Sequence, residues 1–100
     1  MLGSLHYMSP EQIVGSKEIS FTSDIFSLGI IFYSMVTGVF LFKGEDESVV
    51  YSIREDVVQS PVEIKEDLPA DLNRLLLAML EKESKKRPTA LQVLVTLQNL

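Results

Sequence analysis

Cysteine is absent from this chain of 100 residues, and His6 is its only histidine. Without cysteine the chain has no disulfide framework, no thiolate nucleophile and no cysteine-based metal site. This composition fits a reducing environment, so we expect an intracellular, cytoplasmic protein. His6 stands apart from any pattern of Cys, Asp or Ser. We therefore expect a surface loop residue there, and not a metal ligand or a member of a catalytic triad.

Basic residues are scarce relative to acidic ones, with nine Lys and Arg against fourteen Asp and Glu and a net charge of −5. This balance argues against non-specific nucleic-acid binding, and we expect no nucleic-acid partner. No signal-peptide pattern is visible after Met1. One hundred residues allow at most one domain, and an apolar content of 46% is sufficient for a compact core.

Charge is missing altogether from residues 25–42, where thirteen of the eighteen residues are Ile, Leu, Val, Phe, Tyr or Met. We expect a helix over 24–38 that is apolar on all sides and ends at Gly38. Such a helix is either the buried hub of a fold or a membrane span. About fifteen helical residues reach only about 22 Å, short of a hydrocarbon core of ~30 Å, so we favour the hub. Two buried strands are an alternative, because several residues of the run are β-branched.

The ends and the middle of this expected helix carry further predictions. Thr22 and Ser23 can cap it, and Asp24 lies where the helix macrodipole favours an anion. Gly29 in its interior costs roughly 1 kcal/mol against Ala, so we expect another element to pack closely against the backbone there. The apolar positions divide between two sides, with Ile25, Leu28, Phe32, Met35 and Val36 on one and Phe26, Ile30 and Tyr33 on the other.

The remaining segments predict four more helices and no confident strand. Ser9 and Pro10 are typical of the start of a short helix, and Pro69 opens a longer one. Residues 45–58 form an amphipathic pattern, and Thr89-x-x-Gln92 is a capping box for a last helix. The expected apolar faces are Val49, Val50, Ile53 and Val57 in the first of these, Leu72, Leu75, Leu76, Met79 and Leu80 after Pro69, and Leu91, Val93, Leu94, Leu97 and Leu100 at the end.

Three separated stretches resemble, in order and approximate spacing, the C-terminal half of a eukaryotic-type protein kinase domain. Residues 3–11, GSLHYMSPE, are similar to the end of the activation segment, G-T-x-x-Y-M-[AS]-P-E. Residues 24–29, DIFSLG, resemble the D-x-W-S-x-G that begins the central helix of the large lobe. Residues 87–89, RPT, resemble the R-P-[TS] before the last helix.

The resemblance covers essentially the whole chain and implies a fold class that is all-α as seen here. These residues would be the C-terminal part of the large helical lobe of a protein-kinase-like α+β fold, with 1–100 as a partial kinase domain. Its parts would be the end of the activation segment (1–13), the central hydrophobic helix (24–38), a docking helix (45–58) and the last two helices (69–100).

The resemblance also implies roles for particular residues. Glu11 and Arg87 would form the ion pair that ties the activation-segment helix to the loop before the last helix. Asp24 would hold the backbone of the catalytic loop. Gly3, Ser4 and Tyr7 would belong to the loop that receives the substrate residue after the phosphoacceptor. Residues 45–58 would dock a protein substrate or regulator.

Three departures from the family pattern bear on these roles. Gly3-Ser4 with Tyr7-Met8 resembles the serine/threonine class, although Ser4 stands where Thr is usual. Phe26 replaces the usual Trp, which loses an N–H donor and keeps a large apolar ring. Ser34 stands where many kinases that prefer basic substrates have Glu, so that determinant of basic preference is missing.

The motifs for nucleotide and metal are also missing from the chain. Phosphoryl transfer needs a Gly-rich loop, a strand Lys with its Glu partner, a catalytic Asp and Asn, and the Asp of D-F-G. None occurs in this sequence, so we assign it no catalytic, cofactor-binding or metal residue; ATP and Mg are expected for the complete domain.

Three functional hypotheses follow. The leading one is a C-terminal segment of a kinase domain that would transfer the ATP γ-phosphate to protein Ser or Thr when joined to its missing N-terminal part, which would be its first partner. The alternative is a truncated or pseudokinase binding module without catalysis. The third and weakest is a small membrane-associated all-α protein.

Overall fold

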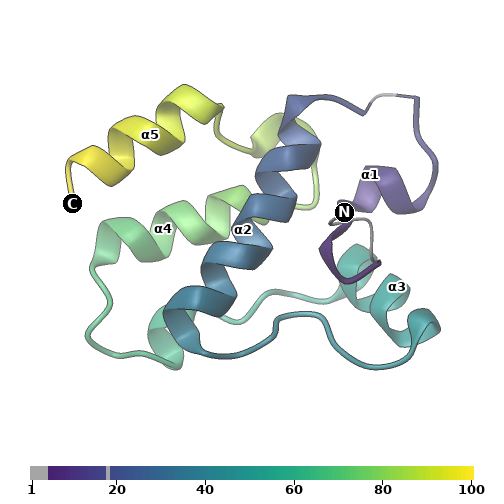
Figure 1. The fold of residues 1–100 in the computed structure, drawn as a ribbon, viewed down its shortest axis with the longest axis horizontal. Helices are drawn as coiled ribbons and strands as arrows, with labels where there is room; N and C mark the ends of the chain where they lie inside the picture. The colour runs from purple at the N-terminus through teal and green to yellow at the C-terminus, as the bar shows by residue number, and fades with distance from the viewer. Residues whose placement is uncertain (1–4, 18) are drawn as a thin grey trace.

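Helices are the only regular secondary structure in the residues that the structure, a computed structural model, describes, which are 5–17 and 19–100. The α-helices are α1 (Pro10–Ile13), α2 (Phe21–Thr37), α3 (Asp46–Glu55), α4 (Ala70–Met79) and α5 (Ala90–Gln98), and the 3-10 helices are η1 (Leu5–Tyr7), η2 (Pro61–Glu63) and η3 (Ser84–Lys86) (Figure 1). The expected all-helical character is confirmed for this part of the chain. The alternative of two strands over 25–42 is wrong, since α2 covers most of that run.

Helix α2 is the hub of the fold, with α1 and α3 on one side of it and α4 and α5 on the other (Figure 1). One face of α2 places Phe26, Ile30 and Tyr33 in a buried cluster with residues of α3. The opposite region of the helix carries Ile25 into a second cluster with residues of α4 and α5. Apolar residues spaced about 100° apart therefore serve two cores. Both predicted faces are used, except that Met35, expected on the side of Ile25, is 75% exposed and belongs to neither cluster.

The start of α2 differs from the prediction. Ser20 is its N-cap, with the side-chain hydroxyl accepting a hydrogen bond from the N–H of Thr22 at 3.4 Å. The expected caps Thr22 and Ser23 therefore lie inside the first turn. The sequence offers three neighbouring hydroxyl groups, and the Ser23 hydroxyl is engaged elsewhere, by Glu11.

Two glycine predictions for α2 are confirmed. Gly38 ends the helix in the left-handed conformation, with φ of 76°, and its N–H bonds to the carbonyl of Ser34 at 2.9 Å. A Cβ on Gly29 would lie 3.0 Å from the Cβ of Met79, so α4 crosses close to the α2 backbone. That close approach explains a glycine in the helix interior.

Two predicted apolar faces are only partly buried. Helix α3 ends at Glu55, so Val57 lies beyond it and is 94% exposed instead of packing on the core. In α5 only Val93 is buried, where it joins the cluster that contains Ile25 of α2 and residues of α4. The other members of its expected face, Leu91, Leu94, Leu97 and Leu100, are exposed.

Within the described ranges, none of the helices combines the length and the apolar character that crossing a bilayer requires.

Candidate functional site

Helix α1 presents Glu11 toward the start of α2. The helix is only four residues long, and a capping box fixes its first turn. The Ser9 hydroxyl accepts from the N–H of Gln12 at 3.3 Å, and the Gln12 side-chain oxygen accepts from the N–H of Ser9 at 2.9 Å. Pro10 fixes the backbone at the first helical position. Glu11 is therefore held on a rigid turn although α1 itself is short.

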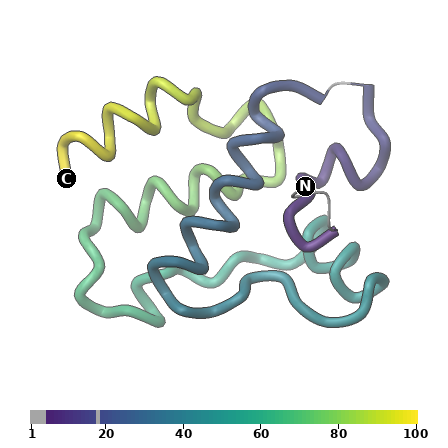
Figure 2. Tube along the Cα trace, in the orientation of Figure 1, coloured from purple at the N-terminus to yellow at the C-terminus, as the bar shows by residue number. Residues whose placement is uncertain are grey.

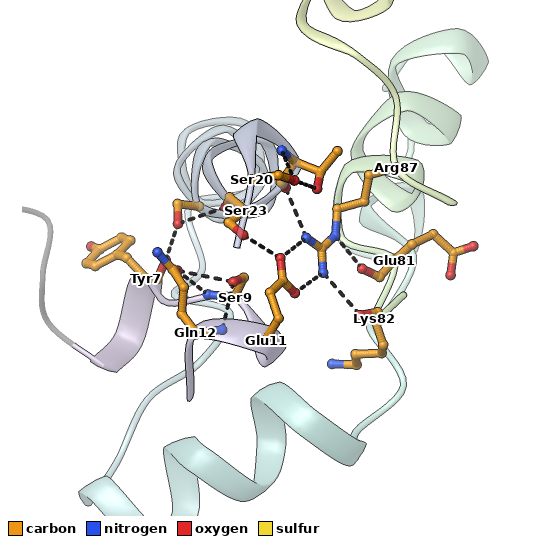
Figure 3. A network of polar contacts seen from close by, with 11 residues as sticks. Tyr7, Ser9, Glu11, Gln12, Ser20, Ser23, Glu81, Lys82 and Arg87 are labelled. Carbon is orange, nitrogen blue, oxygen red and sulfur yellow. Dashed lines mark hydrogen bonds and ion pairs between the residues drawn. The ribbon is translucent and has the colours of Figure 1, made fainter. Parts of the chain in front are cut away.

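Arg87 approaches the same point from the other end of the chain, directly after η3, and is only 5% exposed. Its guanidinium and the Glu11 carboxylate face one another beside α2 (Figure 3). The two residues are 76 positions apart and form a bidentate pair, with Nη1 donating to Oε2 at 2.7 Å and Nη2 donating to Oε1 at 2.8 Å. The structure thus brings together the two residues that the resemblance pairs.

Backbone carbonyls accept hydrogen bonds from the remaining N–H donors of Arg87. Nε donates to the carbonyl of Glu81 at 2.7 Å, Nη1 also donates to that of Thr22 at 2.9 Å, and Nη2 also donates to that of Lys82 at 3.1 Å. With the two bonds to Glu11, all five N–H donors of the guanidinium are used. A buried charge that is satisfied so fully fixes three segments of the chain relative to one another.

The Glu11 carboxylate is held in its ionised form. Burial raises the pKa of this carboxyl, but hydrogen bonds from Arg87 and from the Ser23 hydroxyl outweigh burial and lower the pKa from 4.5 to about 2. The Ser23 hydroxyl donates to Oε2 at 2.6 Å. The pair is therefore fully charged at neutral pH.

A stack of aromatic rings connects this pair to α3. The Cζ atom of Arg87 lies 4.9 Å from the centre of the Phe26 ring, and that ring stacks on Phe42 with a centroid distance of 6.2 Å and an interplanar angle of 9°. The Nζ of Lys82 lies 5.2 Å from the centre of the Phe42 ring. Two cations thus flank two stacked rings, each in a position where cation–π attraction is favourable.

Lys82 also closes the C-terminal end of α3. Its Nζ donates to the carbonyl of Ile53 at 2.7 Å and to that of Ser52 at 3.3 Å. The Ser52 carbonyl also accepts from the N–H of Asp56, and the cation faces the negative end of the helix dipole. Burial lowers the pKa of Lys82, while the nearby carboxylates of Asp56 and Glu55 act in the opposite direction.

The other predicted site residues lie outside this network. Asp24 is exposed on the first turn of α2, and its carboxylate forms no hydrogen bond or ion pair with any residue in the described part of the chain. Tyr7 lies in η1, and its carbonyl accepts a hydrogen bond from the Ser27 hydroxyl. Gly3 and Ser4 are outside the described residues.

A cavity of about 320 Å³ lies next to Tyr7, between η1, α2 and the segment that follows α2. His6, Phe40 and Lys43 line it together with Ser34, whose hydroxyl oxygen is buried and finds no hydrogen-bond partner among the described residues. None of the described residues that line the cavity is Asp or Glu, so these residues offer no anion that would select a basic ligand.

Sequence reasoning missed Lys82, Phe42 and Ser23 as parts of the site. For Lys82 the one local signal is its position shortly after the apolar stripe that ends at Leu80. The partners of these three residues lie between 12 and 40 positions away in sequence, so a local pattern carries no signal for the contacts.

Residues 5–17 and 19–100 hold no group of three or more His, Asp or Glu that could bind a metal ion.

A family model described as "Protein kinase domain" matches residues 1–97. A probable serine/threonine-protein kinase of Clostridium perfringens is 35% identical over the whole chain, which covers 15% of that relative. Serine/threonine-protein kinase A of Synechocystis sp. is 34% identical over 94% of the chain and 18% of its own length. Tyrosine-protein kinase MasK of Myxococcus xanthus is 38% identical over 88% of the chain and 14% of its own length. The chain thus spans less than a fifth of each of these relatives.

Proposed function

The chain belongs to the protein kinase domain family, and from this premise we propose that it is the C-terminal helical segment of a domain that phosphorylates proteins. Joined to its missing N-terminal part, the domain would transfer the γ-phosphate of ATP to Ser or Thr. The observation that supports the proposal is the fully satisfied Glu11–Arg87 pair, which ties α1 to the segment before α5. In the proposed domain these would be the end of the activation segment and the last part of the lobe.

The pair would act by positioning and not by chemistry. Glu11 lies four residues after Tyr7, so anchoring α1 limits the movement of η1 before it. We propose that Tyr7, with Gly3 and Ser4 before it in the sequence, receives the substrate chain. Asp24 is exposed at the start of α2, and its carboxylate forms no hydrogen bond or ion pair with the described residues, which supports a role toward a backbone segment outside them, the catalytic loop.

The cavity beside Tyr7 suggests which substrates fit. Ser34 stands where the family resemblance expects the carboxylate that attracts a basic side chain, and none of the described residues that line the cavity is acidic. We propose that the substrate side chain beside this wall is neutral. A polar tip could supply the hydrogen bond that the buried Ser34 hydroxyl lacks.

ATP and Mg would be held by the missing part of the domain, because the motifs that bind them are not among these residues. This chain would contribute structural support to the domain, through α1, which the Glu11–Arg87 pair holds in place, and through the packed helix α2. Residues 45–58 would in addition dock a protein substrate or regulator.

The test is phosphate transfer by the full-length protein. We expect labelled phosphate from ATP to appear on Ser or Thr of a protein substrate, and phosphoamino-acid analysis separates these from Tyr. We expect the Ser34→Glu variant to gain activity toward peptides with basic residues, with Thr37→Glu in the same helix as a control.

The second candidate is a binding module without catalysis. It is favoured by the exposed apolar side chains on and just after α3, those of Tyr51 and Val57. A folded full-length protein that neither binds Mg-ATP nor transfers phosphate would support this candidate over the enzyme.

A further inference from the structure

A groove of about 580 Å³ lies between the segment that leaves α3 and the C-terminal half of α4. Glu55 ends α3 because Asp56 adopts an extended backbone, with ψ of 139°. The chain then runs back across the molecule to η2 before it turns into α4 (Figure 2). The bonds from Lys82 to the last carbonyls of α3 hold the two walls together at one end.

Part of the lining of this groove is apolar. Val57, Val58 and Leu77 line it, and Val57 is 94% exposed. A valine that exposed, placed beside other apolar groups in a concave surface, is typical of a contact surface and not of an isolated surface residue. The apolar side chain of a partner can therefore be buried there.

The rim of the groove is acidic. Glu55, Asp56 and Glu81 line it, and within the described part of the chain none of their carboxylates forms an ion pair. Of the two cations that line the groove, Arg74 pairs with Asp71, and Lys82, whose Nζ donates to two carbonyls, lies near the carboxylates of Glu55 and Asp56. Three carboxylates against these two cations leave the groove acidic, so it favours positive charge on a ligand.

We propose that this groove binds a segment of a partner protein in which apolar side chains are flanked by Lys or Arg. Val57, Val58 and Leu77 would contact the apolar side chains of the partner, and Glu55, Asp56 and Glu81 would form ion pairs with the flanking Lys or Arg residues. Acidic surfaces such as nucleic acid or an anionic membrane are disfavoured by the same rim. The inference rests on the proposed docking role of residues 45–58 and names the chemistry of what docks.

Binding of a labelled peptide to the full-length protein tests this without any phosphate transfer. The probe has leucines flanked by lysines; one control peptide has glutamates in place of the lysines, and another has serines in place of the leucines. We expect the probe alone to bind, with an affinity that falls as salt is raised. If the full-length protein transfers phosphate but does not bind the probe, the proposal for the groove is wrong and the proposed function is unaffected.

Variants separate the groove from the general charge of the protein. Val57→Asp should weaken probe binding by about tenfold or more, because it places a charge at the apolar contact. Val14→Asp, at an exposed valine after α1, should leave binding unchanged. Glu55→Lys should lower the affinity for the probe and raise the affinity for the glutamate peptide. Glu66→Lys, outside the groove, should change neither affinity.

Several outcomes would overturn the proposal. Equal binding of the probe and its glutamate control, or equal effects of Glu55→Lys and Glu66→Lys, would mean that the groove does not distinguish basic from acidic peptides. Sedimentation that shows self-association abolished by Val57→Asp, without peptide binding, would make the groove an interface between two copies of this chain. Val57 lies beyond the helix on the surface, so thermal melting should show that its variant still folds.

Discussion

The guanidinium of Arg87 lies over the face of Phe26, with Cζ 4.9 Å from the ring centre. Its five donors are used in the plane of the group, and the ring covers one face of it. Burying a charge is costly unless it is paired and hydrogen-bonded, and here both conditions are met. Phe26 stands where the family usually has Trp, and the contact with Arg87 needs the face of the ring rather than an N–H donor.

Removing either partner of the Glu11–Arg87 pair should destabilise the full-length domain strongly. A buried pair broken from one side typically costs ~3–5 kcal/mol, because the remaining charge has no compensation. We expect Glu11→Ala and Arg87→Ala to lower the free energy of unfolding by about that amount, measured with urea.

The double variant should cost less than the sum of the two single variants, because one loss already removes the interaction. Arg74→Ala is a matched control, since Arg74 forms an exposed pair with Asp71. Loss of this exposed pair should lower the free energy of unfolding by less than about 1 kcal/mol. Additive and equally small effects at Glu11 and Arg87 would contradict the pairing.

The pH dependence of unfolding should carry the contribution of Glu11. Its pKa in the folded state, about 2, is below the ordinary value of 4.5. The unfolded chain therefore binds the proton first as the pH falls. The stabilisation should be fully present above pH 4.5 and be lost as the pH falls toward 2.

The Glu11→Gln variant provides the comparison for this pH effect, because it keeps the shape of the side chain and does not titrate. We expect the difference in free energy of unfolding between the parent protein and Glu11→Gln to be constant near neutral pH. It should shrink below pH 4.5, and two parallel curves down to pH 2 would show that Glu11 is not the group responsible.

Lys82 should be required for the order of the last turn of α3. Lys82→Met keeps most of the apolar stem and removes the bonds to the carbonyls of Ser52 and Ile53. Hydrogen bonds from charged groups contribute about 1.5–3 kcal/mol, so we expect a loss of that order. Hydrogen exchange should become faster at the amides of 53–56, in the last turn.

Lys86→Met is the control for Lys82, because Lys86 forms an exposed pair with Glu83 on η3. Exchange in α3 should be unchanged in this variant. If both variants left α3 equally protected, the carbonyl contacts of Lys82 would contribute nothing to its order.

Local patterns predicted much of this fold, because helix periodicity and capping depend on nearby residues. The two faces of α2, its end at Gly38 and the capping box at Thr89 all follow from short-range chemistry. The N-cap of α2 was placed wrongly for a different reason. Ser20, Thr22 and Ser23 offer equivalent hydroxyls, and the contact of Ser23 with Glu11 belongs to tertiary structure.

The site divides in the same way. The resemblance paired Glu11 with Arg87 although nothing in their spacing did, and the membership of the kinase family is confirmed over most of the chain. The Lys82–Phe42 contact joins residues 40 positions apart in the chain and depends on how the segment after α4 lies against the segment after α2. Residue types alone do not specify such a contact, because exposed lysines and buried phenylalanines are common separately.

The exposed apolar surface of this segment supports the proposal that further residues of its domain cover it. Phe21 and Met35 of α2 are 88% and 75% exposed, and most of the apolar face of α5 is open. Apolar surface of this kind usually marks an interface or causes aggregation. We therefore expect residues 1–100, when produced alone, to self-associate or to bind a hydrophobic dye, and we expect the full-length protein to bind much less dye.

Substitutions on the open face distinguish this surface from a general loss of structure. Leu91→Gln and Leu94→Gln should reduce dye binding by residues 1–100 without changing the helix content, because both side chains are already exposed. Val93→Gln should instead increase dye binding, because Val93 is the buried contact of α5. A compact monomer of residues 1–100 with a sharp melt and no dye signal would contradict this prediction, and the 100 residues would then form a self-sufficient fold.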